Sequence, residues 1–316
     1  MSRYTVMTAI PYVNGKPHVG HALELVETDV LARHRRQRGD EVRFQTGTDD
    51  NALKNVQGAE AEGISPAEYV ERVAQRFLAL REVLDLSFDD FIKTSLPDTI
   101  FVHEYLTAGG QKISKSAGNA EDPTDIAATY GTDVLRWWML RAVARAGDTD
   151  YTAERLVARA NEDLANNLGN LANRTVSMVQ RYRQGVIPDL PANNPAAADL
   201  RTARSEAGPA IDRALAKFDF RRAAEAVLRI GDEGNRYVEA VRPWERAKAE
   251  RHDHTGSTAL DAALAELVAT CRDLALHLQP MLPAFASRIA EQCGHGGATV
   301  AEPSPVFPRL DVGHRL

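Results

Sequence analysis

The sequence YTVMTAIPYVNGKPHVGHALELVETDVLARHRRQRG, residues 4–39, decides the fold of the first part of the chain. Its apolar start, Tyr4 to Ile10, predicts a buried strand, and the spacing of apolar residues from His18 to Arg38 predicts a helix that Gly39 ends. Glu41 to Thr46 predicts a second strand, which completes a βαβ unit. In such a unit the helix begins at the carboxyl edge of a parallel sheet, where ligands gather.

The start of this helix has the residues of a phosphate site. His18 and His21 are three residues apart, so both imidazoles lie on one helix face and both can donate hydrogen bonds to phosphate oxygens. The unpaired amides and the dipole of a helix N-terminus also favour an anion, and Gly20 leaves room for a flat base. The alternative is that the two histidines cap or pack the helix.

A second basic motif, Lys112-Ile113-Ser114-Lys115-Ser116, is predicted to lie in a loop from Gly109 to Gly118. Such a loop suits a mobile element that closes over a departing pyrophosphate. When a carboxylate attacks the α-phosphorus of ATP, positioned lysines and Mg²⁺ stabilise the charge that grows on the phosphate oxygens. Lys112 and Lys115 are the candidates, and the alternative is a solvated loop without a function.

Asp49 follows the second predicted strand and therefore lies at the same sheet edge. Its carboxylate can bind the ammonium group of an amino acid. The alternative makes Asp49 or Thr48 the N-cap of a following helix. The residues alone leave both interpretations open.

The rest of the chain is predicted to change from α/β to wholly helical. Phe88 to Thr94 and Ile100 to Leu106 read as strands, and Ser65-Pro66 as a capped helix start. From Asp122-Pro123 onward the pattern is helical. Long amphipathic helices are predicted over about 153–183, 207–241 and 260–293, followed by an irregular tail from 294 to 316.

Composition limits the functions of the chain. It has 316 residues, a net charge of −6 and two cysteines, Cys271 and Cys293, so we expect no disulfide framework and no structural metal. The global charge offers no attraction to nucleic acid, so any RNA would need a local basic patch, and DNA is not an expected partner. The absence of an apolar span or leader predicts a cytoplasmic protein without a membrane partner.

The motifs resemble those of the methionyl-tRNA synthetase family, which belongs to the class I aminoacyl-tRNA synthetases. Ala9 to Gly15 followed by His18 to His21 looks like the family's HIGH region, and Lys112 to Ser116 looks like its KMSKS loop. The resemblance implies ATP and Mg²⁺ as cofactors and a reduced Rossmann-like parallel sheet. It implies catalytic roles for His18, His21, Lys112 and Lys115, ATP binding by Gly20, His21, Ser114, Lys115 and Ser116, and amino-acid binding by Ile10, Tyr12 and Asp49.

The helical half extends this resemblance to a tRNA-binding region. Asn170 and Arg174, four residues apart, together with Trp244 resemble the family's anticodon readers. An exposed indole can stack on an unpaired base while an amide and a guanidinium bind base edges. The alternative is that Trp244 fills a groove between helices and Arg174 pairs with a carboxylate.

The chain departs from the family between residues 94 and 100. There the family has a large segment with a connective insertion, a zinc knuckle and one strand of the sheet, whereas this chain has only Ser95 to Thr99. Asn51-Ala52 also replaces the family's usual His-Gly. Because an unpaired parallel edge exposes backbone donors, we expect the strand Ile100 to Leu106 to move inward and pair beside the first strand.

The resemblance implies an organisation in four parts: a catalytic domain, a linking helical segment, an anticodon-binding-like helical bundle and an irregular tail, at residues 1–121, 122–152, 153–293 and 294–316. The implied function is ATP-dependent activation of an amino acid, most simply methionine, and its transfer to tRNA. Two alternatives remain: transfer of the activated amino acid to a small molecule without tRNA, and a non-catalytic tRNA-binding protein.

Overall fold

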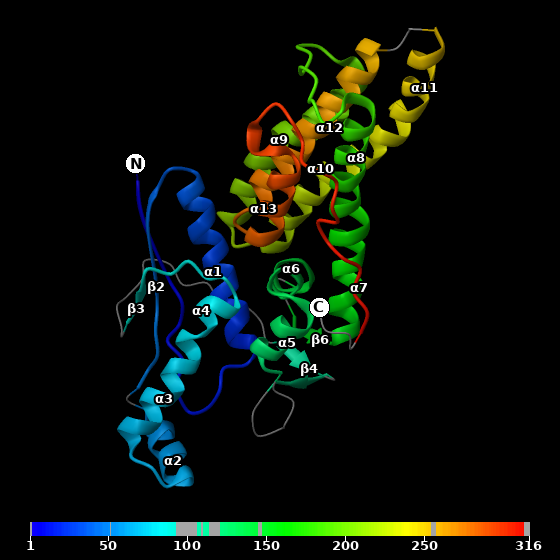
Figure 1. The fold of residues 1–316 in the computed structure, drawn as a ribbon. Helices are drawn as coiled ribbons and strands as arrows, with labels where there is room; N and C mark the ends of the chain where they lie inside the picture. The colour runs from blue at the N-terminus through cyan, green and yellow to red at the C-terminus, as the bar shows by residue number, and fades with distance from the viewer. Residues whose placement is uncertain are drawn as a thin grey trace. The chain divides into compact units, whose positions relative to one another are not determined.

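The computed structural model describes residues 2–50, 52–92, 106–108, 110–113, 121–144, 147–253 and 257–312. The chain divides into two compact units, one of which contains the residues up to Val157 and the other Ala158–Leu310 (Figure 1). The first unit is α/β and the second is helical. Each unit is described by itself.

The first unit is built on the predicted βαβ arrangement. Strand β1 (Arg3–Met7) pairs in parallel with β2 (Glu41–Thr46), with Arg3 opposite Glu41 and Met7 opposite Gln45. The helix α1 (Val19–Gln37) connects them. The bounds of β2 confirm the prediction, whereas β1 ends three residues earlier than predicted. The third predicted strand is reduced to β3 (Asp90–Phe91), which pairs in parallel with β2.

A second small sheet has the order β5-β4-β6. In it β4 (Leu106–Ala108) is antiparallel to β5 (Gln111–Lys112) and parallel to β6 (Thr149–Tyr151). The expectation that the strand ending at Leu106 pairs beside β1 is therefore wrong for its described part. Because β5 pairs with one edge of β4 and β6 with the other, β4 has no free edge at which β1 could pair.

The hairpin between β4 and β5 also corrects the prediction of a loop from Gly109 to Gly118. Gln111 and Lys112 are in a strand, because Gly110 adopts a left-handed φ of 72° that turns the chain back on β4. Thr107 then lies opposite Lys112. The lysine motif thus begins on a short strand, and its residues Ser114, Lys115 and Ser116 lie outside the described part of the chain.

A buried ion network fixes α1 in the first unit. The Asp29 carboxylate accepts from Arg136 Nη2 at 2.8 Å and from Arg33 Nε at 2.7 Å, and neither Asp29 nor Arg136 is exposed to solvent. Ser87 donates to the same carboxylate through its amide and its hydroxyl, each at 2.7 Å. Because Arg136 lies on α6 (Thr132–Ala142), the network ties α1 to α6.

The helix starts predicted from capping residues are confirmed. Ser65 accepts from the Glu68 amide at the start of α3 (Pro66–Leu78), and Asp122 accepts from the Thr124 amide at the start of α5 (Pro123–Tyr130). The remaining helices of this part are α2 (Leu53–Glu62) and α4 (Leu80–Val83).

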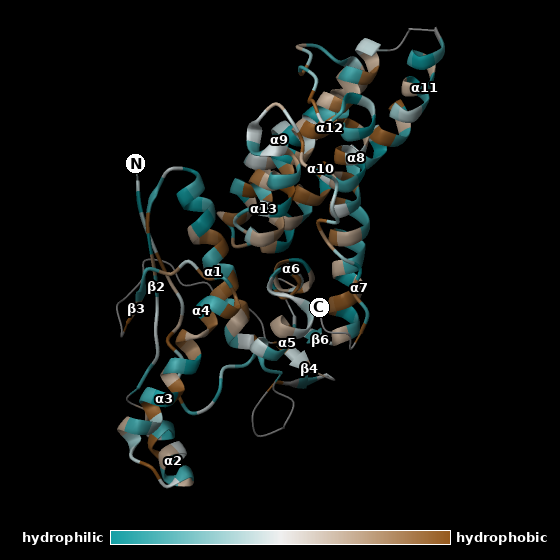
Figure 2. Ribbon diagram, viewed as in Figure 1, coloured by the Kyte–Doolittle hydropathy of each residue, from teal (hydrophilic) through white to brown (hydrophobic). Residues whose placement is uncertain are grey.

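The second unit is a helical bundle. The predicted helix over 207–241 is two helices, which break before Asp219, the N-cap of the second. The predicted helix over 260–293 is also two, because Pro283 begins a new one. In Figure 2, hydrophobic and hydrophilic residues alternate along the bundle helices, as expected for helices with one buried face. The helices are α7 (Ala153–Ala160), α8 (Asn170–Arg183), α9 (Ala198–Leu215), α10 (Phe220–Val241), α11 (Pro243–Asp253), α12 (Ser257–Leu278) and α13 (Pro283–Gln292).

Two further features complete this unit. Residues Asn161–Gly169, between α7 and α8, form a π-helix. The tail after α13 packs back on the bundle: the Leu310 amide donates to Asn161 Oδ1 at 2.8 Å, and the Val306 amide donates to Asn173 Oδ1 at 3.3 Å. Among the described residues of the chain, none of the helices is long and apolar enough to cross a membrane.

Candidate functional site

His18 and His21 form a reciprocal cap at the start of α1. His18 is the N-cap, and its Nδ1 accepts from the Gly20 amide at 3.2 Å, while His21 Nδ1 accepts from the His18 amide at 3.1 Å. The ring centroids are 3.8 Å apart. The two histidines therefore cap the helix, as the alternative interpretation of the sequence proposed. Because each Nδ1 accepts a hydrogen bond, each neutral imidazole carries its proton on Nε2.

Gly20 is required by the position of the His18 ring. A Cβ atom at Gly20 would lie 3.0 Å from His18 Cε1 and 3.1 Å from His18 Nδ1, closer than ordinary contacts. The space that the sequence suggested for a flat base is thus occupied by the imidazole of His18 in this structure. A ligand that used this space would have to turn the imidazole away from the Gly20 amide.

The end of the lysine-containing segment meets the start of α1. The Val19 amide donates to the carbonyl oxygen of Glu121 at 3.2 Å, and Glu121 follows the motif of residues 112–116 by five positions. Figure 1 shows α5, whose N-cap Asp122 follows Glu121, beside this end of α1. The structure therefore brings one flank of the lysine motif to the histidine motif. It also occupies the Val19 amide, so the side chains rather than this amide would bind a phosphate group.

Asp150 fixes the other flank of the lysine motif. Its Oδ1 accepts from the Gly110 amide at 2.9 Å and from Thr107 Oγ1 at 3.0 Å, so it joins β6 to the turn that leads to Lys112. These two hydrogen bonds, and then the nearby Arg155, hold the pKa of the Asp150 carboxyl below its usual value. A carboxylate that keeps its charge at neutral pH thus sets the direction of the hairpin.

The predicted amino-acid end of the site is assembled from two loops. Tyr12 and Asp49 form a parallel bridge, in which the Asp49 amide donates to the Pro11 carbonyl oxygen at 2.9 Å. Tyr12 is 49% exposed, and Ile10 and Asp49 are half-buried. The N-cap of α2 is Ala52, without a side-chain cap, so the alternative that Asp49 or Thr48 caps this helix is wrong.

Two acidic residues of α1, Glu24 and Glu27, are three positions apart. Glu24 accepts a hydrogen bond from the Ala9 amide, which ties the chain before Ile10 to the helix. One turn further on, Glu27 is 7% exposed. Burial, followed by the charge of Glu24, raises the pKa of Glu27 to about 8. Glu27 is therefore mostly protonated at neutral pH.

The predicted RNA readers come together in the second unit. Arg174 Nη2 donates to Glu239 Oε1 at 2.7 Å, and the Arg174 guanidinium carbon lies 5.8 Å from the centre of the Trp244 ring. Arg174 therefore pairs with a carboxylate, as the alternative proposed. Trp244, however, is 37% exposed and does not fill a groove between helices. Asn170 is exposed one turn before Arg174 on α8.

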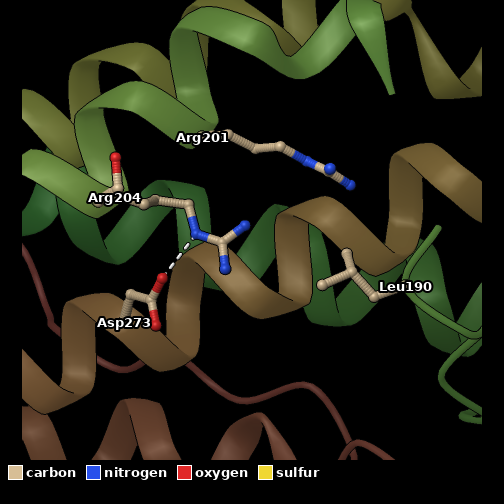
Figure 3. A pocket seen from close by; sticks show the side chains of 5 residues that line it. Leu190, Arg201, Arg204 and Asp273 are labelled. Atoms are coloured by element: carbon tan, nitrogen blue, oxygen red, sulfur yellow. Dashed lines mark hydrogen bonds and ion pairs between the residues drawn. The ribbon is translucent and has the colours of Figure 1, made fainter. Parts of the chain in front are cut away.

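A pocket of about 320 Å³ opens in the same unit between α9, α12 and the loop that precedes α9 (Figure 3). Arg204 Nε donates to Asp273 Oδ2 at 2.6 Å, and Arg204 Nη1 donates to Glu266 Oε2 at 3.1 Å. Arg201 Nε donates to the other oxygen of Glu266 at 2.7 Å. Carboxylates thus neutralise both arginines. Their ion pairs link α9 to α12, and the pocket that they line is not an anion site.

The sequence did not indicate several of these residues. Asp150 and Glu239 act through partners 40 and 65 positions away, and no local motif marks either of them. Glu121 contributes only its carbonyl oxygen, which any residue could supply. Glu27 could have been noticed as a carboxylate among the apolar residues of an otherwise buried helix face.

Known proteins resemble this chain over both units. The sequence profile of the family described as tRNA synthetases class I (M) matches residues 4–98 and 93–176. These segments make up more than half of the chain, which therefore belongs to this family of class I tRNA synthetases. The two matched segments overlap at residues 93–98.

The curated relatives are enzymes named methionine–tRNA ligase. That of Halalkalibacterium halodurans is 34% identical over 235 residues, which is 69% of this chain and 35% of that protein, so the matched segment spans about a third of the relative. That of Brucella suis is 23% identical over 509 aligned positions, which cover 97% of this chain and 98% of the relative. Because 509 positions exceed the 316 residues here, that relative contains internal sequence without a counterpart in this chain.

A solved structure shows the same fold. Mycobacterium tuberculosis methionyl-tRNA synthetase in complex with methionyl-adenylate matches with a TM-score of 0.91 and 22% sequence identity, over 98% of this chain and 100% of that chain. The α/β region followed by helices is therefore the fold of this synthetase. At this identity the likeness concerns the fold alone.

Proposed function

We propose that the chain is a methionyl-tRNA synthetase-like ligase that activates methionine with ATP as an aminoacyl-adenylate and transfers the aminoacyl group to tRNA. The hydrogen bond from the Val19 amide to the Glu121 carbonyl carries this proposal, because it holds the end of the lysine-containing segment at the histidine-capped helix start. The family membership and the methionine–tRNA ligase relatives support it.

In this proposal the chain's residues act by position and charge. The carboxylate of methionine attacks the α-phosphorus of ATP, and pyrophosphate leaves with the electron pair of the broken P–O bond. The Nε2–H groups of His18 and His21 donate to phosphate oxygens, and Lys112 and Lys115 stabilise the leaving pyrophosphate. Gly20, Ser114 and Ser116 contact ATP. Mg²⁺ enters as the complex of the triphosphate.

The amino acid occupies the end of the site near the Tyr12–Asp49 bridge. Asp49 binds its ammonium group, and Ile10 and Tyr12 contact its side chain. The second unit binds the anticodon through Asn170, Arg174 and Trp244. The corresponding division of labour is catalytic for residues 1–121, connecting for 122–152, and anticodon-binding for 153–293, with 294–316 as the tail.

ATP–pyrophosphate exchange across the twenty amino acids tests activation. We expect methionine-dependent exchange that His21→Ala and Lys115→Ala abolish. A matched control is Lys248→Ala, which removes an exposed lysine of the helical unit and should leave the exchange unchanged. Exchange with a different amino acid would contradict the methionine assignment. No exchange with any amino acid would exclude the enzymatic proposal.

Charging of a methionine tRNA transcript tests the acceptor. We expect methionyl-tRNA to form and Trp244→Ala to raise the tRNA concentration needed for half-maximal charging, without changing methionine-dependent exchange. Methionine-dependent exchange without charging would instead favour a small-molecule acceptor. Binding of tRNA without exchange would favour a non-catalytic RNA-binding protein.

A further inference from the structure

An exposed polar stripe on α8 continues beyond the proposed anticodon readers. Asn170, Arg174, Ser177 and Arg181 are spaced by four, three and four residues, so they lie on one face of this α-helix. Asn170, Ser177 and Arg181 are exposed, and Arg174 is half-buried. At about 1.5 Å per residue, Arg181 lies about 10 Å beyond Arg174 along the helix axis.

Arg181 differs from its neighbours in having no acidic partner. Arg174 pairs with Glu239, and Arg183 pairs with both Glu250 and Asp261. For Arg181 the described part of the chain offers no hydrogen bond and no ion pair, and its guanidinium carbon lies 5.8 Å from the centre of the neighbouring Tyr182 ring. An exposed guanidinium that no carboxylate neutralises keeps its full charge and its donors for an external anion.

The net charge of the chain shows why an arginine without an acidic partner matters for RNA binding. With a net charge of −6, the molecule as a whole repels a polyanion, so an RNA needs local positive groups in the right place. Arg181 supplies such a group on the helix face that also carries Asn170 and Arg174. In protein–nucleic acid interfaces, contacts to phosphates fix the position of the strand and contacts to bases select its sequence.

We infer that Arg181 binds a backbone phosphate of the same RNA loop whose bases meet Asn170, Arg174 and Trp244. This inference rests on the proposed function, because it takes the tRNA anticodon loop as the ligand of this face. Arg181 anchors the strand two helical turns from Arg174, and Ser177 between them is small enough to let the strand pass. Arg181 thus contributes affinity that is independent of the loop sequence.

The test compares Arg181→Gln with Arg213→Gln. Arg213, in the last turn of α9, is also exposed and also has no carboxylate partner among the described residues, so the two variants remove the same charge from different faces. Binding of a fluorescent methionine tRNA transcript, and of a transcript with a scrambled anticodon, is measured from 50 to 300 mM KCl, and the thermal midpoint of each variant confirms that it is folded.

We expect Arg181→Gln to weaken the binding of both transcripts equally, by about two- to fivefold, as for the loss of an exposed charge pair. The slope of log K against log salt should become less steep by about 0.7, the change for one lost phosphate contact with a single strand. Arg213→Gln should change neither quantity. These results together would support the inference.

Three outcomes would overturn the inference. Arg181→Gln could bind like Arg213→Gln while Trp244→Ala loses discrimination between the two transcripts; the proposed function would then stand and only the phosphate contact would be wrong. Arg181→Gln could weaken the binding of one transcript far more than that of the other, which would show that Arg181 contacts a base and not a phosphate. The unaltered chain could bind neither transcript, in which case the proposed RNA function fails as well.

Discussion

The amide of Val19 and the carbonyl oxygen of Glu121, 102 positions apart in the sequence, are joined by a hydrogen bond of 3.2 Å. Val19 is the first residue of α1 after the His18 cap, and Glu121 lies directly before the N-cap of α5. The bond therefore connects the start of α1, which carries the histidine motif, with the start of α5, whose preceding segment carries the lysine motif. Among the described residues, the sheet that contains β1 has the order β1-β2-β3.

Replacing His21 separates its structural role from its proposed catalytic role. His21→Gln keeps an acceptor at the third helical position and so preserves the reciprocal cap, whereas His21→Ala removes it. We expect His21→Ala to lower the free energy of unfolding by about 0.5–2 kcal/mol and His21→Gln to change it little. Both variants should lose ATP–pyrophosphate exchange. Normal exchange by His21→Gln would show that the imidazole serves only as a cap.

Replacing Asp29 should destabilise the first unit strongly. Asp29→Asn removes the carboxylate charge that pairs with the fully buried Arg136 guanidinium, a loss of about 3–5 kcal/mol for a broken buried pair. Glu41→Gln is the matched control, because it breaks the exposed pair with Arg3, which should contribute less than about 1 kcal/mol. Urea unfolding measures both. Equal midpoints for the two variants would contradict a stabilising role for the Asp29 network.

Glu27 should make stability depend on pH. Its folded pKa of about 8 lies above the ordinary 4.5, so the folded state binds the proton more tightly than the unfolded state. The free energy of unfolding should then fall as pH rises from about 4.5 to about 8 and level off beyond. At 1.36 kcal/mol per pKa unit the full change is at most about 5 kcal/mol.

The neutral variant Glu27→Gln tests this pH dependence. It should remove most of the fall in stability and should be more stable than the unaltered chain at pH 8 but not at pH 5. Urea midpoints measured at half-unit steps of pH would show it. Parallel curves for the two proteins would exclude Glu27 as the source.

Asp150 should hold the hairpin that leads to the lysine motif. Asp150→Asn removes the charge that accepts from the Gly110 amide, so hydrogen–deuterium exchange of a peptide spanning residues 106–113 should become faster at pH 7. Because the pKa of Asp150 is lowered in the folded state, its contribution is present above the ordinary carboxyl pKa of 3.8 and is lost as the pH falls through the folded value.

Asp148→Asn is the control for the hairpin, since Asp148 is exposed in the same segment. It should leave the exchange of residues 106–113 unchanged. If the two variants behaved alike, the hydrogen bonds of Asp150 would not determine the position of the hairpin.

The parts of the fold that sequence could predict depend on local chemistry. Ser65 and Asp122 cap their helices, and β2 has its predicted bounds, because capping and hydrophobic periodicity involve neighbours within a few residues. The two breaks inside the predicted long helices were missed, because an amphipathic pattern continues across a short turn. Pro283 is the one local signal that could have revealed one of these breaks.

Strand pairings and side-chain contacts between distant segments could not be predicted from the sequence. The three residues of β6 pair with β4 from about forty positions further on, and a strand so short has no periodicity to detect. The same holds for the site: the sequence left open whether His18 and His21 cap the helix, and it could not tell that their Nδ1 atoms accept hydrogen bonds from the Gly20 and His18 amides. The sequence likewise could not identify Glu239 as the partner of Arg174, because the two residues are 65 positions apart.

The π-helix Asn161–Gly169 has a consequence for the direction in which α8 presents its side chains. Its i to i+5 hydrogen bonds place more residues in each turn than an α-helix does, so the angular position of every later side chain is shifted relative to Ala160. Replacing these wide turns by ordinary α-helical turns of the same length would rotate Asn170, Arg174 and Arg181 together around the helix axis. The direction of the face proposed to bind RNA is thus set in part by a segment that precedes it in the chain.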